Sequence, residues 1–439
     1  MERIKPKKIE ISPPKGTRDF LPEEMIIRQE ILEKVRSVFE AFGFQPLETP
    51  AIESWEVLSA KGAGGPEILK ETYKFKDRGG RWVGLRYDLT VPLARVVASR
   101  RDLTLPFKRY QIEKVWRYGD VTKGRLREFL QADIDTVGCK SMLADAEIVA
   151  CAISVLTHLG FKEFFVRLNH RKILTALVKY AGVDDEKVMD TFRGIDKLDK
   201  IGMDGVRADL LDRGIPEPVT NKVLKFIRIG EAGPEGVLEK AGKLIGNIKE
   251  GREGIEELKE MISYLRKMDV EPKFKVDLSL ARGLDYYTGP IFEVFASKGI
   301  GSVAGGGRYD GMIGLFSGKE VPATGISLGI ERVIEVMKER KMIETKRTKV
   351  KVFVANVDED VMDGVLRIVQ SLRECGIPSD FNLRGRSLRG QLEYANSLSI
   401  PYVLIIGSKE LKTNKFRLKD MKTGKEETLS MREVLARLE

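Results

Sequence analysis

The spacing of hydrophobic and polar residues changes several times along the 439-residue chain, and each spacing predicts a different element. Near the N-terminus, apolar residues recur every four positions from Ile27 to Phe39. Pro22 and two glutamates precede this run, and Gly43 follows it. Acids in a first turn and a glycine stop are typical of a helix, so we predict a helix over about 22–42.

Between Pro106 and Val137 the pattern alternates around a Gly/Lys/Arg-rich break, which predicts a long antiparallel hairpin. Alternation places polar side chains of both strands on one surface. The residues on this surface are Arg109, Gln111, Glu113 and Arg117 on the first strand, and Arg127, Gln131, Asp133 and Asp135 with the aromatic Phe129 on the second. Two interpretations stay open: a solvated outer face or the floor of a ligand site. The return-strand set lacks lysine, which favours the floor.

Farther along, residues 165–270 are helical in pattern and highly charged, and they look inserted. Alternation returns at 274–280 and 291–295, followed by a glycine-rich strand over 301–311 and a helix over about 325–341. After a polar stretch, strand and helix patterns alternate from 350 to 406, which predicts a small closing α/β domain. The domains we expect are 1–164 and 273–343 as two parts of a core, 165–272 as an insertion, and 344–439 as the closing domain.

Composition fits an ordinary folded protein, with 42% hydrophobic and 32% charged residues. No apolar run approaches the roughly 18 residues of a membrane span, and the basic N-terminus lacks a signal-peptide core, so we expect a cytoplasmic protein that does not enter membranes. The three cysteines are too scattered for a disulfide framework. The two histidines do not stand at zinc-site spacing, so we expect no metal site made by protein side chains and no Ser/His/Asp triad. A net charge of +10 favours a polyanionic partner, although many basic proteins bind no nucleic acid.

Two further features carry candidate chemistry. The glycine-rich block from Gly305 to Gly311 lacks the Gly-Lys-Ser/Thr ending of a P-loop, and its context does not match a dinucleotide fingerprint. It fits a strand whose glycines let a ligand approach the backbone. Arg332 interrupts an apolar helix face; it is either a structural partner of Glu331 or Glu335, or a phosphate ligand.

Several blocks together resemble histidyl-tRNA synthetases, in which they occur in the same order. These are Lys15–Pro22, Leu85–Thr90, the hairpin, Arg282–Gly289, Gly305–Asp310 and Gly325–Arg332. The resemblance spans nearly the whole chain, and the closing domain is similar to the anticodon-binding domain of these enzymes. Arg-Gly-Leu-Asp-Tyr-Tyr followed by Gly-Gly-Arg-Tyr-Asp is characteristic of the histidine enzymes and their near paralogues. The Tyr87–Thr90 block looks like the archaeal and eukaryotic branch.

The resemblance implies an α+β fold with a class II synthetase antiparallel sheet flanked by helices, a helical insertion and a C-terminal α/β anticodon-binding domain. It also implies a homodimer whose interface is built by the first helix. The implied activity is ligation of L-histidine to tRNA(His): ATP and histidine give histidyl-adenylate and pyrophosphate, and histidine then passes to the 3′ end of the tRNA. ATP is a substrate and Mg²⁺ is the expected ion.

The implied catalytic residues are Arg117 and Arg332, similar to the arginines of motifs 2 and 3, and Arg282 at the reacting carboxylate. The residues implied to bind histidine are Asp88, Leu89, Thr90, Arg117, Gln131, Asp135, Arg282, Tyr286, Tyr287 and Tyr309. Those implied to bind ATP are Arg117, Arg125, Arg127, Phe129 and Arg332. Attack of a carboxylate on the α-phosphorus develops charge on phosphate oxygens, which preplaced arginines and Mg²⁺ stabilise without a general base.

Two alternatives remain. One is the non-catalytic regulatory paralogue of ATP phosphoribosyltransferase in histidine biosynthesis, which usually lacks the anticodon domain and some of the arginines. The other is a synthetase for threonine, proline or glycine, which the doubled tyrosine disfavours.

Overall fold

The structure is a computed structural model that describes residues 11–60, 65–100, 102–229, 233–270, 273–281, 286–297 and 299–438. The chain divides into two compact units. The larger holds Leu32–Met342 with the residues before Asp19, and the smaller holds Asp19–Ile31 with Ile343–Glu439. The predicted first helix is confirmed as α1 (Pro22–Ala41), which has Glu23 and Glu24 in its first turn.

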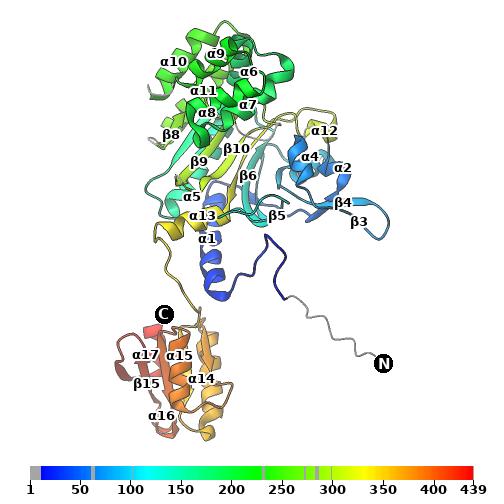
Figure 1. The fold of residues 1–439 in the computed structure, drawn as a ribbon. Helices are drawn as coiled ribbons and strands as arrows, with labels where there is room; N and C mark the ends of the chain where they lie inside the picture. The colour runs from blue at the N-terminus through cyan, green and yellow to red at the C-terminus, as the bar shows by residue number, and fades with distance from the viewer. Residues whose placement is uncertain are drawn as a thin grey trace, which may run out of the picture. The chain divides into compact units, whose positions relative to one another are not determined.

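The described part of the larger unit is organised around an eight-stranded sheet (Figure 1). Its spatial order is β1 (Gln45–Pro46), β5 (Phe107–Trp116), β6 (Glu128–Val137), β11 (Ala323–Gly329), β10 (Gly301–Arg308), β9 (Pro290–Ser297), β7 (Phe165–His170) and β8 (Phe274–Val276). The outermost pairs are parallel and all the other neighbours are antiparallel. This confirms the predicted sheet, and β5 with β6 is the predicted hairpin.

Helices cover this sheet. α5 (Met142–His158) contacts β11 and β10, and its Ser141 cap accepts a hydrogen bond from the Leu143 amide at 3.2 Å. Most of its residues are buried because it also packs against α11 (Lys249–Lys267). α13 (Ile330–Glu339) packs on β6, β10 and β11. A smaller sheet has the order β2 (Ile52–Ser54), β4 (Trp82–Leu85), β3 (Lys74–Lys76) and contacts α2 (Trp55–Leu58), which in turn contacts α4 (Thr90–Ser99). α3 (Gly65–Lys70) precedes β3 in the chain.

The helical region follows β7 and packs through amphipathic faces. It comprises α6 (Arg171–Ala181), α7 (Val188–Asp196), α8 (Leu198–Asp212), α9 (Glu217–Ile227), α10 (Gly233–Ile245) and α11. In α6 the apolar residues from Ile173 to Ala181 are buried, and they meet α9, α10 and α11. Figure 1 shows these helices gathered together at one end of the unit.

Two predictions about elements were wrong. Phe165–His170, assigned to the helical stretch, is the strand β7, paired with β9 and β8. The helix expected from Gly325 begins only at Ile330, because Ala323–Gly329 forms the strand β11 in the middle of the sheet. Thr-Gly-Ile-Ser-Leu-Gly alternates like a strand, and one of its two partners, β6, lies far away in the sequence.

The smaller unit has a five-stranded sheet in the order β13 (Ser379–Phe381), β12 (Val352–Asn356), β14 (Tyr402–Ile406), β15 (Lys415–Asp420), β16 (Glu426–Ser430). The first three strands are parallel and the last three antiparallel. Its helices are α14 (Met362–Glu374), α15 (Leu388–Ser397), α16 (Ser408–Thr413) and α17 (Met431–Leu438). Apolar clusters lie on both faces of β12 and β14, which confirms the predicted α/β domain. None of the helices described along the chain is both long and apolar enough to cross a bilayer.

Candidate functional site

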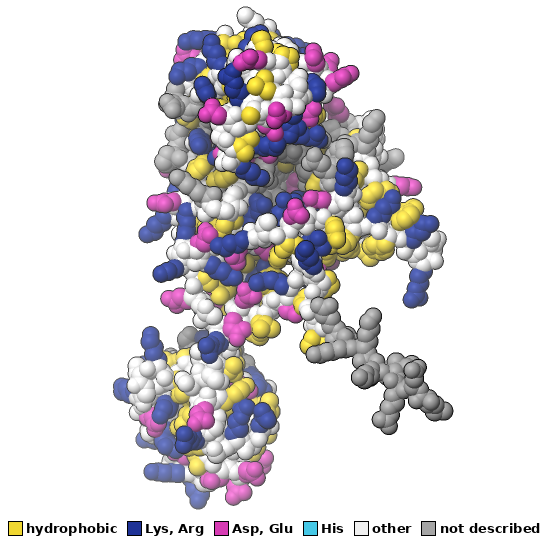
Figure 2. All heavy atoms as spheres, in the orientation of Figure 1, with side chains coloured by type: hydrophobic (Ala, Val, Ile, Leu, Met, Phe, Trp, Pro, Cys, Tyr) yellow, Lys and Arg dark blue, Asp and Glu magenta, His cyan; other side chains and the backbone are white. Residues whose placement is uncertain are grey.

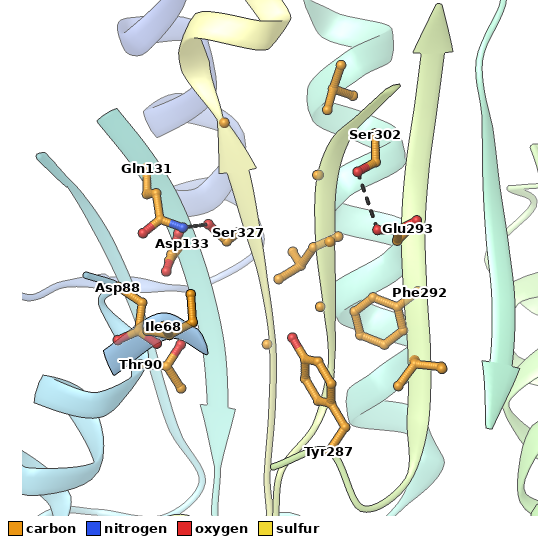
Figure 3. A pocket seen from close by; sticks show the side chains of 18 of the residues that line it. Ile68, Asp88, Thr90, Gln131, Asp133, Tyr287, Phe292, Glu293, Ser302 and Ser327 are labelled. Atoms are coloured by element: carbon orange, nitrogen blue, oxygen red, sulfur yellow. Dashed lines mark hydrogen bonds between the residues drawn. The ribbon is translucent and has the colours of Figure 1, made fainter. Parts of the chain in front are cut away.

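A cavity of about 550 Å³ lies over the central strands of the large sheet (Figure 3). β6 and the glycine-rich strands β10 and β11 form its floor, and Asp88, Thr90 and the tyrosines border it. Across β11 the register pairs Gly325 with Asp135 and Gly329 with Gln131. Four residues of strand separate these pairs, or about 13 Å. We call the region around Asp135 the acidic end and the region beyond Gly329 the arginine end.

Asp135 is held from two directions at the acidic end. One carboxylate oxygen, Oδ2, lies 2.6 Å from Nη2 of Arg109, which stands directly opposite on β5. The other, Oδ1, accepts a hydrogen bond from the Tyr309 hydroxyl. Burial raises the pKa of Asp135, while Arg109 and Tyr309 oppose that rise. The carboxylate therefore has a fixed direction.

Two further carboxylates, Asp88 and Asp133, are buried beside the cavity. Burial raises the pKa of Asp88 to about 6 and that of Asp133 to about 7. The acceptor oxygens without a hydrogen-bond partner among the described residues include Oδ2 of Asp88, Oε1 of Gln131 and Oδ1 of Asp133. Buried acceptors in native proteins are normally satisfied, so this group fits a ligand that carries a cationic, hydrogen-bond-donating group.

Three tyrosines line the cavity at the same end. The ring centroids of Tyr286 and Tyr287 are 4.8 Å apart, and those of Tyr286 and Tyr309 are 5.9 Å apart. Burial raises the pKa of each hydroxyl, so all three stay neutral near pH 7 and can donate as well as accept hydrogen bonds. Figure 3 shows Asp88, Thr90, Gln131 and Asp133 on one side of β11, and Tyr287, Phe292 and Glu293 on the other.

The arginine end holds two preplaced cations. Nε of Arg117 donates to the Tyr87 carbonyl at 2.8 Å, and its guanidinium lies 5.4 Å from the Phe129 ring centroid. Nη1 of Arg332 donates to the Ser302 carbonyl at 2.7 Å, so Arg332 is anchored on β10. The carboxylate of the neighbouring Glu331, which also lines the cavity, accepts a hydrogen bond from the Leu130 amide at 3.0 Å.

The hairpin loop brings two more arginines near this end. Arg125 lines the cavity and lies 3.4 Å from Glu71, with its side chain half exposed. Arg127 stacks on Tyr118 at 3.8 Å, and its Nε donates to the Gly119 carbonyl at 3.2 Å. Its position supports the loop backbone from outside the cavity lining.

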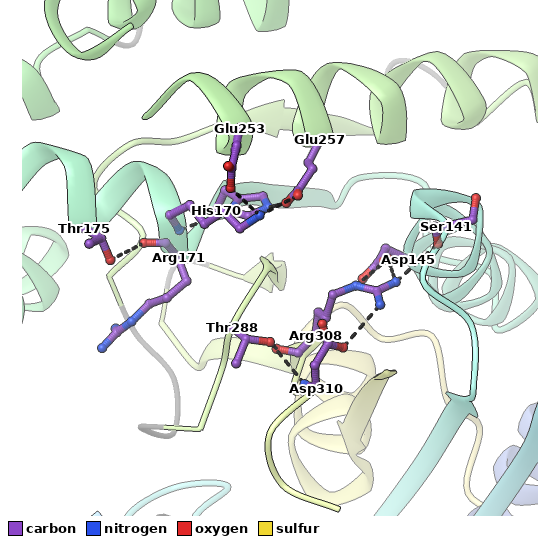
Figure 4. Close-up of polar contacts among 11 residues, drawn as sticks. Ser141, Asp145, His170, Arg171, Thr175, Glu253, Glu257, Thr288, Arg308 and Asp310 are labelled. Atoms are coloured by element: carbon purple, nitrogen blue, oxygen red, sulfur yellow. Dashed lines mark hydrogen bonds and ion pairs between the residues drawn. The ribbon is translucent and has the colours of Figure 1, made fainter. Parts of the chain in front are cut away.

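A polar network around Arg308 holds together the segments next to Tyr287 and Tyr309 (Figure 4). Arg308, at the end of β10, forms an ion pair with Asp145 of α5, and its Nη1 donates to the Cys139 carbonyl at 3.0 Å. The Arg308 carbonyl accepts a hydrogen bond from the Thr288 amide at 2.8 Å, and Thr288 Oγ1 accepts one from the Asp310 amide at 3.1 Å. These bonds join the segment after Tyr287 to the segment that carries Tyr309.

Most of the residues singled out in the sequence line this one cavity. They are Asp88, Thr90, Arg117, Arg125, Phe129, Gln131, Asp135, Tyr286, Tyr287, Tyr309 and Arg332. Leu89 is fully buried outside the lining, and its carbonyl accepts a hydrogen bond from Arg109. Arg282 lies outside the described residues; the described residues nearest to it in the sequence, Ala281 and Tyr286, both line the cavity. Among the described residues, no group of three or more metal-binding side chains occurs.

Comparison with known proteins identifies the family to which the chain belongs. A family model described as histidyl-tRNA synthetase matches residues 16–333, and one described as anticodon binding domain matches residues 351–439. The chain belongs to the histidyl-tRNA synthetase family. It is 43% identical to the histidine–tRNA ligase of Aeropyrum pernix, covering 91% of each chain, and 38% identical to histidine–tRNA ligase 1 of Bacillus cereus, covering 94% of this chain and 96% of that one. The crystal structure of histidyl-tRNA synthetase from Nostoc superposes with a TM-score of 0.86 at 33% identity, covering 98% of this chain and all of the other.

In this histidyl-tRNA synthetase fold, sequence reasoning missed several residues that border the cavity. The sequence predicts Asp133 on the polar face of the hairpin. Its position between Gln131 and Asp135 was a usable signal that it belongs to the site. The helical region contributes a further group, which the sequence did not connect with the site: Arg171, Met189, Phe192, Arg193 and Asp196. Their proximity depends on how α6 and α7 pack, which no local pattern reveals.

Proposed function

We propose that the chain is a histidine–tRNA ligase that uses ATP, first forming histidyl-adenylate and then charging tRNA(His). The observation that carries this proposal is the polarity of the cavity. Buried carboxylates and neutral tyrosine hydroxyls occupy one end, and the anchored Arg117 and Arg332 occupy the other. Such a cavity suits a cationic amino acid at one end and a triphosphate at the other.

Activation forms a bond between a histidine carboxylate oxygen and the α-phosphorus of ATP, and it breaks the bond from that phosphorus to the pyrophosphate oxygen. Arg117 would stabilise charge on the α-phosphate and Arg332 on the departing γ-phosphate, with Arg125, Arg127 and Phe129 contributing to ATP binding. Both main arginines are held by backbone carbonyls, so little reorganisation is needed as charge develops. Arg282 would bridge the histidine carboxylate and the α-phosphate, an assignment that rests on its motif.

Selectivity for histidine requires partners for both imidazole nitrogens, because a purely apolar pocket rejects isosteres weakly. Asp135 can accept from one ring N–H, and the hydroxyls of Tyr286, Tyr287 and Tyr309 can meet the other nitrogen. The unsatisfied oxygens of Asp88 and Gln131, with Thr90 beside them, would hold the α-ammonium group. Leu89 would take part through its backbone, since its side chain lies outside the lining.

Magnesium fits only as an ion that arrives with ATP. The described carboxylates form no metal cage, and Mg²⁺ commonly binds through phosphate oxygens and water with one or two carboxylates. Glu293, which lines the cavity, could supply such a carboxylate. The ion would neutralise charge on the phosphates when bound.

The remaining assignments concern the whole chain. We assign catalysis to residues 1–164 and 273–343, the insertion to 165–272, and anticodon binding to 344–439, and we place the protein in the cytoplasm as a homodimer joined through α1.

Lys and Arg side chains are spread over the visible face among acidic ones (Figure 2), and the net charge of +10 favours a polyanion such as tRNA. The Tyr87–Thr90 block supports membership of the archaeal and eukaryotic branch, and a phylogenetic tree of the family would test that placement.

The alternative is the non-catalytic regulatory paralogue. The anticodon-binding match at 351–439 and the anchored Arg117 and Arg332 favour the ligase. Charging of tRNA(His) with labelled histidine by the purified protein tests the choice. Acid-precipitable, alkali-labile histidyl-tRNA should accumulate in the presence of ATP and Mg²⁺. Histidine binding without any charging would favour the regulatory protein instead.

A further inference from the structure

Arg109 is buried completely beneath the floor of the cavity. Its side chain is fully buried, and it is not part of the cavity lining. Burying a guanidinium is costly unless it is paired, so a position like this requires specific partners. The sequence predicts that Arg109 lies on the polar face of the hairpin, but it indicates no role for this residue.

The partners of Arg109 belong to two different walls of the acidic end. Its Nη2 lies 2.6 Å from Oδ2 of Asp135 on β6 and donates to the Leu89 carbonyl at 3.2 Å. Leu89 stands between Asp88 and Thr90, both of which line the cavity. One guanidinium therefore ties the strand that carries Asp135 to the segment that carries Asp88.

Three buried carboxylates interact electrostatically with this cation. Arg109 lowers the pKa of Asp88, Asp133 and Asp135 against the larger, raising effect of burial. Other charged or titratable groups also face the three carboxylates. They are Arg117 near Asp88, Tyr309 bonded to Asp135, and Tyr286 and Tyr287 across the cavity, in addition to the carboxylates' effects on one another. The tyrosines are neutral near pH 7, so Arg109 and Arg117 supply the positive charge.

We propose that Arg109 is a positioning residue for histidine recognition: it fixes the direction of the Asp135 carboxylate and supplies positive charge to the Asp88, Asp133 and Asp135 group. This inference rests on the proposed function, in which that group binds the imidazole and the ammonium. Asp135 has a short side chain, and Arg109 and Tyr309 each hold one of its oxygens. Without Arg109, one of the two restraints on Asp135 is lost and three carboxylates share a buried site with less positive charge.

The test is the pH profile of histidine-dependent ATP–pyrophosphate exchange in the full-length Arg109→Met variant. Protonation of the carboxylates should begin at higher pH without the guanidinium, so the acidic limb of kcat/KM for histidine should move up by about one pH unit. At pH 7, kcat/KM for histidine should fall by about tenfold or more, whereas the KM for ATP should change by less than about twofold. Circular dichroism and thermal melting establish that the variant is folded.

Lys108→Met is the matched control. Lys108 is the adjacent residue on β5, points to the other face of the sheet and pairs with Glu147 at 2.7 Å. Its loss should leave the acidic limb where it is. If Arg109→Met lowers activity equally at every pH, or leaves the limb unmoved, Arg109 is only a structural residue and the inference is wrong.

Arg109→Lys keeps the test decisive if the methionine variant does not fold. A lysine retains the charge, but its shorter side chain ends in an ammonium that would not occupy the position of Nη2 of Arg109, the nitrogen that meets both Asp135 and the Leu89 carbonyl. The acidic limb should stay near its wild-type position while the KM for histidine rises several-fold. An unchanged KM would overturn the positioning role. Absence of histidine-dependent exchange in the wild-type protein would instead count against the proposed function itself.

Discussion

Ionised Asp133 destabilises the ligand-free protein because its carboxyl is buried and one of its oxygens has no hydrogen-bond partner among the described residues. Burial raises its pKa from 3.8 to about 7, so the folded protein binds this proton more tightly than the unfolded chain does. The free energy of unfolding therefore falls as pH rises from about 4 to about 7, and the full loss is present above that. At about 1.4 kcal/mol for each pH unit, the penalty is on the order of 4 kcal/mol.

Replacing Asp133 with Asn should therefore stabilise the ligand-free protein at pH 8 and weaken histidine binding at the same pH. The gain in thermal midpoint should be several degrees at pH 8 and should shrink toward pH 5, where the wild-type carboxyl is already protonated. Calorimetry at the two pH values, with histidine titrations, measures both effects. An equal change in midpoint at pH 5 and pH 8 would mean that the ionisation of Asp133 is not the cause.

At the residue scale, the sequence could predict which side chains share a surface but not how deeply each lies. Strict alternation along β5 and β6 put Arg109, Gln131 and Asp135 on one face, and the register confirms their alignment. The ion pair between Arg109 and Asp135 depends on side-chain burial, which comes from the strands and helices that cover the hairpin. Alternation alone fits an exposed face equally well.

At the element scale, β11 carries a glycine that the acidic end requires. A Cβ added at Gly325 would lie 2.0 Å from Oδ1 of Asp135 and 2.7 Å from the Ile134 carbonyl oxygen. Gly325→Ala should therefore displace the Asp135 carboxylate and lower kcat/KM for histidine by about a hundredfold, the usual effect of misplacing a binding group by an ångström.

Gly311→Ala is the control for that substitution, since an added Cβ at Gly311 meets nothing within 4 Å. Steady-state exchange kinetics of the two variants should differ sharply, with the Gly311 variant close to wild type. Similar kinetics in both would show that the tight contact at Gly325 can relax without moving Asp135.

Elements with strong local patterns were predictable, whereas strands defined by distant partners were not. α1 and the hairpin follow from the sequence because their hydrophobic periods are regular, and β12 and β14 follow because they are short, nearly continuous apolar runs. β7 was hidden in a charged helical stretch, and its partner β9 lies more than a hundred residues away. The sequence predicts one helix over the residues that form both β11 and α13. The pairing of β11 with β6 and β10 identifies it as a strand.

At the scale of the whole molecule, the two reactions should depend on different parts of the chain. Every described residue that lines the cavity lies between Ile68 and Arg332, and the anticodon-binding match begins at residue 351. A protein truncated after residue 344 should keep most histidine-dependent exchange but charge tRNA(His) at least tenfold more slowly, because it loses anticodon contacts. Parallel exchange and charging assays measure the difference. Equal losses in both would contradict an anticodon role for the C-terminal domain.

The central claim is that the acidic end selects histidine and the arginine end activates it with ATP. ATP–pyrophosphate exchange, measured with each of the twenty amino acids in turn, tests this most directly. We predict Mg²⁺-dependent exchange with histidine and none above background with the other nineteen. Exchange driven by another amino acid, or no exchange by folded protein at saturating histidine and ATP, would contradict the account.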